Sequence, residues 1–473
     1  MKALKADLCV IGAGSGGLSV AAAASQMGAK VVLLERDKMG GDCLNSGCVP
    51  SKALLAAAKH AASAREGKKY GVTCERVNIN YAGVADYVQS VIAAIAPHDS
   101  IERFTSLGVK VISAAGTFRD ATTVQAGDQL IAARRYVIAT GSQAFVPPIP
   151  GLKNVPYFTN DTIFSLREQP RHLVIIGAGP IGCEMAQAHR MLGTEVSLID
   201  VDCMMPRDDP DCVAVLRTQF IEQGISLFEL ANITRVRQQD GAILITLQHE
   251  GEHHELHASH VLVATGRRPN VADLNLEKAG IEYTPRGIQV DKRLRTSNHR
   301  CYAIGDVIGD FQFTHAAGYQ AGVIIKQCLF RWPSAVNYRA MPWVTYTDPE
   351  LAQVGLTERQ AMAAGLSIHV EKLAFKASDR AQAEGHTSGL LKLILDKKAR
   401  VLGISIVGLL AGELILPWSL MINQKIKLSQ LASQIVAYPT VSELTKAIAG
   451  QYYKPLITSN IVRTVVKRLA KLP

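Results

Sequence analysis

Apolar runs separated by glycine-rich turns divide the first half of the chain into predictable elements. Asp7 to Ile11 and Val31 to Leu34 have the apolar pattern of buried strands, and the Ala-rich segment Leu18 to Met27 between them is typical of a helix. Strand, glycine turn, helix and strand in this order form one βαβ unit. Residues 173–200 repeat this plan around a predicted helix from Ile181 to Leu192. The pattern therefore predicts two nucleotide-binding folds.

The pattern changes from Val344 onward. Strand-like runs occur at Leu390 to Leu395 and at Val401 to Val407, and helical patterns follow from Glu413 to Gln434, which predicts a third, α+β domain. The segment Val401 to Ile422 is apolar and long enough to imitate a membrane span. Its internal glycines, one glutamate and one proline favour a strand, a turn and a buried helix instead.

Composition supports a globular protein of several domains. The chain has 473 residues, so two to four domains are expected, and its 48% hydrophobic and 19% charged residues differ from those of disordered chains. The net charge of +10 comes without a nucleic-acid recognition motif, which argues against nucleic-acid binding. The nine cysteines are unevenly spaced and give no secreted disulfide framework. Since the polar N-terminus also lacks the layout of a signal peptide, a cytoplasmic location is expected.

The first glycine turn is a candidate dinucleotide cradle. Gly12, Gly14 and Gly17 follow the first strand directly, where glycines allow a tight turn and close approach of a pyrophosphate to a helix N-terminus. Glu35 ends the second strand, at the place from which a carboxylate accepts hydrogen bonds from a ribose. We call Gly12–Gly17 the first cradle.

A second cradle repeats each part of the first. Gly177, Gly179 and Gly182 form the turn, and Asp200 ends the following strand, with no basic residue before Arg207. Because a carboxylate at this position repels the 2′-phosphate of NADP, NAD(H) is favoured over NADP(H) unless Arg207 folds back. Two cradles imply two dinucleotides, and the simplest pair is a tightly held FAD with a diffusible nicotinamide.

Two cysteines lie five positions apart directly after the first unit. Cys43 and Cys48 flank Gly47 in the segment GGDCLNSGCVPSK, and their sulfurs can meet if the segment starts a helix. A dithiol that cycles with a disulfide takes up two electrons, the number that a hydride delivers through a flavin. The alternatives are inert buried thiols or half a metal site, but no nearby Cys or His completes a ligand set, so no metal is expected.

The segment GGDCLNSGCVPSK resembles the redox-active motif of the class I pyridine nucleotide-disulfide oxidoreductases, which include dihydrolipoamide dehydrogenase, glutathione reductase and mercuric reductase. Ala139-Thr140-Gly141 and the segment from Ala264 to Asn270 resemble the strand ends of that family that return to the flavin domain. Ala303-Ile304-Gly305-Asp306 resembles its second FAD motif. The resemblance covers nearly the whole chain.

The resemblance implies a role for each matched residue. Cys48 would face the flavin, Cys43 would meet the substrate, and Lys52 would pair with Glu184 beside the flavin, while Asp306 would hold the ribityl chain. The helix N-terminus and Lys52 would lower the pKa of Cys48. The implied cofactor-binding residues are Gly12, Gly14, Gly17, Glu35, Lys52, Thr140, Gly141, Gly177, Gly179, Gly182, Asp200, Gly266, Arg267, Gly305 and Asp306.

The resemblance also implies the domain plan, an α/β chain with two Rossmann-like domains, for FAD and NAD, and a C-terminal α+β dimerisation domain. The expected boundaries are 1–150 and 271–340 for the two parts of the FAD domain, 151–270 for the NAD(P) domain and 341–473 for the dimerisation domain. In a homodimer, Tyr438 of one subunit would approach Cys43 of the other.

Near its end the chain departs from the family pattern. Dihydrolipoamide and glutathione reductases carry a His-Pro-Thr whose histidine is oriented by a Glu five residues later, but this chain has Tyr438 at the histidine position and retains Glu443. Tyrosine is a poor base at neutral pH because its unperturbed pKa is near 10. Dithiol exchange is therefore expected to be slow.

Mercuric reductase resembles this chain in carrying a tyrosine there, so reduction of a metal ion or of a quinone is an alternative. The C-terminal cysteine pair that passes mercury inward is missing, since no cysteine follows Cys328. His315 is expected to be a packed or backbone-bonded histidine rather than a replacement base. A second alternative is a non-catalytic, redox-sensing flavoprotein.

Basic and apolar residues alternate in the last twenty positions, from Lys454 to Pro473. This composition fits a solvated or disordered tail, or an amphipathic basic helix on an anionic membrane or a partner. Peripheral membrane contact is therefore a hypothesis, beside a homodimer and a small-molecule or protein disulfide as the other partners.

Overall fold

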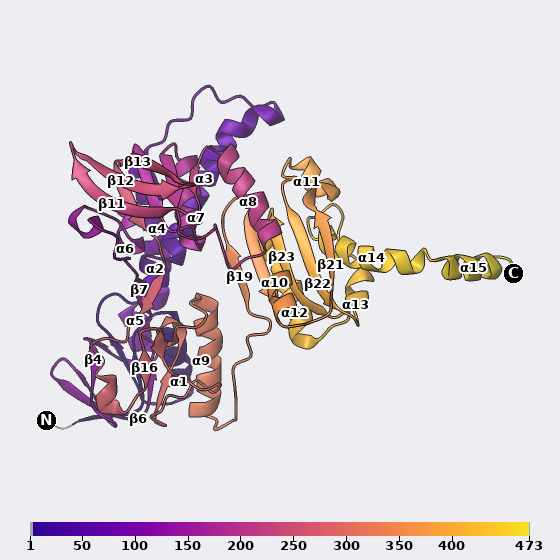
Figure 1. Cartoon of the computed structure of the whole chain (residues 1–473). Helices are drawn as coiled ribbons and strands as arrows, with labels where there is room; N and C mark the ends of the chain where they lie inside the picture. Colours follow the sequence, from indigo (N-terminus) through magenta and orange to yellow (C-terminus); the bar gives the residue numbers. More distant parts are fainter. Residues whose placement is uncertain (1–2, 473) are drawn as a thin grey trace. The chain divides into compact units, whose positions relative to one another are not determined.

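The computed structural model describes residues 3–472, and they form two compact units (Figure 1). The first unit contains the chain up to Val201 together with Leu230–Asn337, and the second contains Asp202–Glu229 and the chain from Tyr338 onward. Met1, Lys2 and Pro473, at the outer ends of the expected 1–150 and 341–473 domains, lie outside the described residues.

A mostly parallel sheet forms the first half of the first unit. Its strands run in the order β3-β2-β1-β6-β5-β4, and β18 pairs in parallel with the end of β6. The bounds are β1 Leu4–Ile11, β2 Val31–Glu35, β3 Lys110–Ser113, β4 Gly116–Asp120, β5 Thr123–Ala126, β6 Gln129–Ile138 and β18 Cys301–Ala303. Helix α1 (Ser15–Gln26) packs against α9 (Thr314–Cys328), so a segment about 300 residues along the chain returns to the first βαβ unit.

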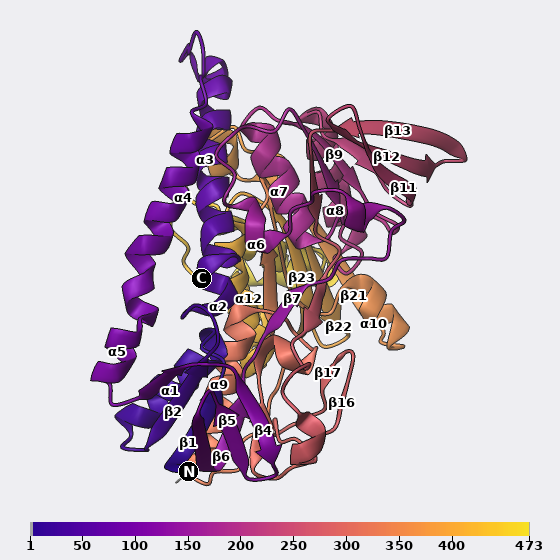
Figure 2. The same cartoon turned by 90° about the vertical axis from the view of Figure 1, so that its left-hand side faces the viewer.

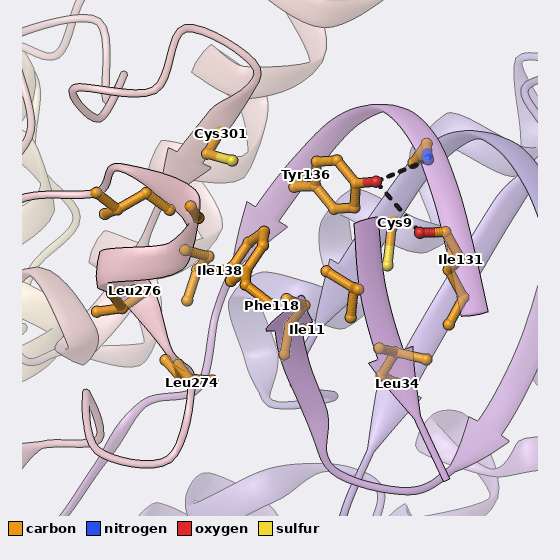
Figure 3. Close-up of a cluster of buried hydrophobic side chains, with 14 of the residues drawn as sticks. Cys9, Ile11, Leu34, Phe118, Ile131, Tyr136, Ile138, Leu274, Leu276 and Cys301 are labelled. Atoms are coloured by element: carbon orange, nitrogen blue, oxygen red, sulfur yellow. Dashed lines mark hydrogen bonds between the residues drawn. The ribbon is translucent and has the colours of Figure 1, made fainter. Parts of the chain in front are cut away.

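The core of this sheet includes side chains from the returning segment (Figure 3). Tyr136 on β6 is fully buried and meets Phe118 edge to face, with ring centroids 5.6 Å apart. Its hydroxyl accepts a hydrogen bond from the Ala133 N–H at 2.9 Å, which satisfies its polar atom inside the core. Leu274 and Leu276 join the same cluster. Burial of these apolar groups fixes the return segment on the sheet.

Helices connect this sheet to the second nucleotide fold. Helix α3 (Cys48–Glu66) runs beside α4 (Tyr81–Ile95), as Figure 2 shows, and also packs against α7 (Pro180–Met191). The shorter helices are α2 Gly41–Asn45, α5 Ile101–Ser106 and α6 Asn160–Ile163.

The second nucleotide fold has parallel strands in the order β9-β8-β14, with α7 between β8 and β9. Beside it lies an antiparallel meander, β11-β12-β13. The strands β7 and β15 form a separate short pair, and the pair β16-β17 packs on the first sheet, since Ile288 of β17 belongs to the core of that sheet. The bounds are β7 Ser142–Ala144, β8 His172–Ile176, β9 Glu195–Ile199, β11 Asn232–Gln239, β12 Ala242–His249, β13 Glu252–Ala258, β14 His260–Val263, β15 Arg267–Pro269, β16 Tyr283–Thr284 and β17 Gly287–Ile288.

The second unit is built on an antiparallel sheet in the order β19-β20-β23-β22-β21. Helix α12 (Ala411–Gln424) packs on the sheet and contributes the fully buried Trp418 to its core. The other bounds are α8 Pro210–Glu222, β10 Ser226–Phe228, β19 Pro342–Thr345, β20 Glu350–Gly355, α10 Glu358–Ala363, β21 Ile368–Ala374, α11 Asp379–Ala383, β22 Leu390–Asp396, β23 Val401–Gly408, α13 Leu428–Ala432, α14 Glu443–Ile457 and α15 Asn460–Leu469.

A buried lysine attaches α8 to this sheet. Lys392 on β22 is 1% exposed, and its Nζ lies 2.9 Å from a carboxylate oxygen of Asp209 and 2.6 Å from one of Asp211. Glu358 is a third partner, at 2.6 Å. Because a buried charge needs such partners, segment 202–229 belongs structurally with the C-terminal unit, although it falls inside the expected 151–270 domain. The domain boundaries stay a prediction.

The predicted fold class is confirmed, with two nucleotide folds and a C-terminal α+β unit. The apolar segment Val401 to Ile422 forms the expected strand, turn and buried helix, β23 and α12. Across residues 3–472, every helix is too short or too polar to cross a bilayer.

Candidate active site

Close backbone packing explains the glycines of the first cradle. A Cβ on Gly12, which has φ +103°, would lie 2.4 Å from the carbonyl oxygen of Ala139, and one on Gly17 would lie 1.9 Å from that of Gly12. Neither position therefore tolerates a side chain. A Cβ on Gly14 would meet no protein atom within 4 Å, so this glycine borders open space. That arrangement fits a pyrophosphate resting on the N-terminus of α1.

The first cradle opens into a cavity of about 380 Å³. Residues from distant parts of the sequence converge on it: among the expected cofactor residues and cysteines, the lining includes Gly12, Gly14, Glu35, Cys43, Thr140, Gly141, Gly305 and Asp306. The cavity therefore fits a dinucleotide that extends from the cradle toward the cysteine pair.

The carboxylate of Glu35 supports the cradle as well as lining the cavity. Its Oε2 accepts a hydrogen bond from the Ala13 N–H at 2.7 Å. The matching bond is present in the second cradle, where Oδ2 of Asp200 accepts from the Ala178 N–H at 2.5 Å. Each acidic residue thus holds the glycine turn and points toward it.

Hydrogen bonds hold together the strand ends that resembled the family motifs. The Thr140 hydroxyl donates to the carbonyl oxygen of Asn270 at 2.9 Å, and the Asn270 side-chain amide donates to the carbonyl oxygen of Thr140 at 2.9 Å. Gly141 follows with φ +66°, and Gly266 precedes β15 with φ +130°. Both turns therefore occur where the backbone favours glycine.

Asp306 is held in a small charged cluster. Its Oδ2 accepts from the Ser142 hydroxyl at 2.5 Å and lies 3.6 Å from the guanidinium of Arg267, which also lies 3.3 Å from Asp42. Burial raises the pKa of Asp306 above its ordinary value, while Ser142 and Arg267 act in the opposite direction. The carboxylate is thereby fixed at the cavity wall, where it can bind hydroxyl groups.

The second cradle repeats the close packing of the first. A Cβ on Gly177, with φ +112°, would lie 2.4 Å from the carbonyl oxygen of Ala264, and one on Gly182 would lie 1.8 Å from that of Gly177. A Cβ on Gly179 would meet no protein atom within 4 Å, as at Gly14. The expected basic alternative, Arg207, belongs to the other unit.

Cys43 and Cys48 occupy consecutive helices. Cys43 lies in α2 and is half-buried, whereas Cys48 is the first residue of α3 and is exposed. Both are free thiols in the structure. The start of a helix at Cys48 agrees with the sequence expectation and points the α3 N-terminus at this sulfur.

The two thiols have opposite acidities. The hydrogen bond from Cys43, assisted by Thr314 and Lys52, lowers the pKa of Cys48 to about 6. The same hydrogen bond, together with burial, raises the pKa of Cys43 far above its usual range. A reduced pair therefore holds its remaining proton on Cys43 and its negative charge on Cys48. The expected lowering of the Cys48 pKa is present, but its main cause is the neighbouring thiol rather than Lys52.

Lys52 and Glu184 form the expected ion pair. The Lys52 Nζ donates to Oε2 of Glu184 at 2.7 Å, which joins α3 to α7. The Glu184 side chain is 6% exposed and that of Lys52 is 36% exposed. Lys52 follows Cys48 by one turn of α3, and its positive charge contributes to lowering the pKa of Cys48.

Tyr438 and Glu443 lie in the second unit, whereas the cysteines lie in the first. Tyr438 is 70% exposed, and its hydroxyl donates to Oδ2 of Asp379 at 3.2 Å, a bond that raises the pKa of Tyr438. Glu443 begins α14 and accepts a hydrogen bond from the Thr440 N–H at 3.4 Å.

Two residues beside the candidate catalytic groups were not predicted. The Thr314 hydroxyl lies 3.5 Å from the Cys48 sulfur, although only its neighbour His315 was considered. His315 is exposed and stacks on Phe313 with ring centroids 5.2 Å apart, so it packs through a ring contact. Asp379 was missed because its contact with Tyr438 joins positions 59 residues apart.

Comparison with protein families identifies the chain. The family model described as pyridine nucleotide-disulphide oxidoreductase matches residues 6–321, and that family's dimerisation domain matches residues 341–449. The chain belongs to this family. Members bind FAD and a pyridine nucleotide around a redox-active disulfide, and the dimerisation domain supports a homodimer.

The chain is similar in sequence, to about the same degree, to members of this family that have different substrates. It is 32% identical over 451 residues to a mercuric reductase of Staphylococcus aureus, covering 95% of this chain and 82% of the relative. It is 34% identical over 455 residues to a dihydrolipoyl dehydrogenase of Bacillus subtilis, covering 94% and 96%. The Cu(II) complex of the HOCl-induced flavoprotein disulfide reductase RclA from Escherichia coli superposes with a TM-score of 0.85, 27% identity and coverage of 94% and 99%. The family relationship thus establishes an oxidoreductase and leaves its electron acceptor open.

Proposed function

We propose that this oxidoreductase uses NADH to reduce the Cys43–Cys48 disulfide and passes the electrons to an acceptor other than a small disulfide. The unequal acidity of the two thiols carries this proposal. With Cys48 as thiolate and Cys43 as thiol, the pair accepts the two electrons and one proton of a hydride without a further proton donor. The balanced reaction converts NADH and the disulfide into NAD⁺, the Cys43 thiol and the Cys48 thiolate.

The first cradle and its cavity fit FAD, and the second cradle fits NAD(H). FAD supplies the two-electron relay between the nicotinamide and the disulfide when it is bound. Glu35 and Asp306 would hold its ribose and ribityl hydroxyls, since both carboxylates line the cavity. Asp200 would accept hydrogen bonds from the ribose of NAD(H) and repel a 2′-phosphate.

Tyr438 stands where dihydrolipoamide and glutathione reductases carry a histidine, and this difference supports an acceptor whose reduction needs no imidazole base. The Tyr438 hydroxyl already donates to Asp379, and the resulting rise of its pKa makes tyrosinate scarcer at neutral pH. Proton transfer during exchange between Cys43 and a substrate disulfide would therefore lack the imidazole that usually acts as its acid–base catalyst. Cys43 and Cys48 still provide two electrons to an acceptor that reacts directly with the thiols.

Reduction of a soft metal ion is the second candidate function. Thiolates are preferred ligands of soft metal ions. A mercuric reductase and a copper-complexed flavoprotein disulfide reductase are among the similar proteins. Among residues 3–472, we find no cluster of three or more His, Cys, Asp or Glu side chains that could hold a metal ion. In this candidate function the ion would therefore bind directly to the cysteine pair.

Steady-state NADH oxidation with a panel of acceptors tests both proposals. Lipoamide, glutathione disulfide, mercuric and cupric ions, a water-soluble quinone and oxygen would each be supplied to the FAD-loaded dimer. We expect slow turnover with lipoamide and glutathione disulfide and fast turnover with at least one of the metal ions, the quinone or oxygen, whereas a redox sensor would be reduced once and stop. Fast wild-type turnover of lipoamide would contradict the proposed role of Tyr438.

Tyr438→His is the matched gain-of-function variant. Glu443 lies five residues later, and its charge already acts on position 438, so an imidazole would gain an orienting carboxylate. General acid–base catalysis contributes about 10²- to 10⁴-fold, so lipoamide turnover should rise at least about tenfold and its pH profile should gain a limb near pH ~6.5. Tyr438→Phe is the control, since it removes the hydroxyl without supplying a base.

A further inference from the structure

A helix near the C-terminus lies beyond the matched dimerisation domain. That match stops at residue 449, whereas α14 continues to Ile457 and α15 spans Asn460–Leu469. Thr458 and Ser459 separate the two helices. The Ser459 hydroxyl accepts a hydrogen bond from the Val462 N–H at 3.4 Å. Figure 1 shows α15 extending beyond α14 on the side away from the sheet of its unit.

One side of α15 is apolar and uncovered. Ile461, Val465 and Leu469 repeat every four residues, which places them in one row along the helix, and Val462 and Val466 form the adjacent row. Ile461 is 78% exposed and Leu469 is 57% exposed. Leu456 and Ile457, at the end of α14, are also exposed, so the apolar surface continues across the break between the helices.

The opposite side of α15 is basic. Arg463 and Arg468 flank the two apolar rows, and Lys467 lies between them on the far side of the helix. Lys471 follows one residue after Ala470. No Asp or Glu occurs after Glu443, so nothing in the sequence of this segment neutralises these charges.

We propose that α15 binds the surface of an anionic lipid bilayer. A helix with this division lies in the interface with its apolar rows among the acyl chains and its basic side chains reaching the headgroup phosphates. Pairing of α15 with a second copy would bury the apolar rows but bring together two helices that carry only positive charge. The lipid surface matches both sides of the helix at once. This inference does not depend on the identity of the electron acceptor.

Vesicle flotation of the FAD-loaded full-length protein tests the proposal. Wild type should float with vesicles of equimolar phosphatidylcholine and phosphatidylglycerol and remain in solution with phosphatidylcholine alone. Each basic residue near an anionic surface contributes about fivefold, so reversing two charges in Lys467→Glu/Arg468→Glu should weaken binding at least about twentyfold. Val465→Asn/Leu469→Asn should abolish flotation without changing the net charge.

Lys397→Glu/Lys398→Glu is the matched control. These lysines are exposed in the turn between β22 and β23, and their reversal changes the net charge by the same amount. The control should float like wild type, and NADH oxidation should be unchanged in all three variants. Equal flotation of all variants, or no flotation of wild type, would overturn the proposal. A variant truncated after Ile457 provides a further test, with its oligomeric state measured by light scattering. If this truncation dissociated the dimer, α15 would be a contact between subunits, and the proposal would be overturned.

Discussion

The two cradles share their backbone geometry but differ in what covers them. In the first, Gly16 is buried, and a Cβ there would lie 3.1 Å from Ile304 and 3.2 Å from Ala317, both delivered by the returning segment. The matching residue of the second cradle is Ile181, which is 36% exposed. The returning segment thus covers Gly16 in the first turn, whereas Ile181 at the same position of the second turn is partly exposed. Under the proposed assignment of FAD to the first cradle and NAD(H) to the second, the segments that cover the motif, more than the motif itself, distinguish the retained cofactor from the exchangeable one.

Replacing the open glycine of each cradle should break the two sites separately. A Cβ at Gly14 or at Gly179 would meet no atom of a neighbouring segment within 4 Å, so we expect both Gly14→Val and Gly179→Val to fold. We expect Gly14→Val to weaken FAD binding at least about a hundredfold, which is ~2.7 kcal/mol, and to purify without its yellow colour. Gly179→Val should retain FAD and lose a similar factor in kcat/KM for NADH.

Flavin absorbance and NADH kinetics of the two purified variants measure this difference, and circular dichroism checks that both are folded. Full FAD occupancy in folded Gly14→Val would show that the first cradle does not hold the flavin. Loss of FAD from folded Gly179→Val would reverse the assignment of the two sites.

Neutralising the acidic residue of each cradle should show which of the two carboxylates determines the preference for NADH over NADPH. Wild type should prefer NADH over NADPH by at least about tenfold, or ~1.4 kcal/mol, because Asp200 repels a 2′-phosphate. Asp200→Asn can still accept the Ala178 hydrogen bond and should reduce the preference severalfold. Glu35→Gln, the same change in the first cradle, should leave it unaltered. Stopped-flow reduction by each nucleotide measures the ratio, and equal rates in wild type would refute the role of Asp200.

The smallest expected effect concerns the cysteines beside the first cradle. The hydrogen bond from Cys43 is the main cause of the lowered pKa of Cys48, so Cys43→Ala should raise that pKa by about one unit, or ~1.4 kcal/mol. A lowered thiol pKa means that the thiolate is present above about pH 6 and is lost below it in the reduced wild-type protein. The thiolate absorbance of Cys43→Ala should therefore disappear at a higher pH. An unchanged midpoint would assign the effect to Lys52 and Thr314.

Local pattern predicted the parts of the site that lie close together in sequence. The strands and helices of both βαβ units follow from apolar periodicity, and the glycine turns, Glu35 and Asp200 follow from their spacing along one unit. The start of α3 at Cys48 also follows from its own segment. These features depend on few residues and on strong backbone constraints.

Contacts between distant segments could not be predicted in this way. Thr314 approaches Cys48 across 266 positions, and Lys392 attaches segment 202–229 to the C-terminal unit through ion pairs that span more than 180 positions. Apolar pattern identifies which faces are buried but not which segment covers them. For the same reason the end of the chain was compatible with either a tail or a helix, and the structure shows the helices α14 and α15.

Anaerobic titration with NADH tests the central claim, that Cys48 is the thiolate beside the flavin, most directly. Addition of about two electrons to the FAD-loaded wild type should produce a long-wavelength absorption band, because the Cys48 thiolate is the predominant form above about pH 6. Cys48→Ser should retain FAD and its reduction by NADH but lack the band. Cys43→Ser has no disulfide to reduce, so it should show the band before NADH is added and lose it as the flavin itself is reduced. Persistence of the band in Cys48→Ser would contradict the account.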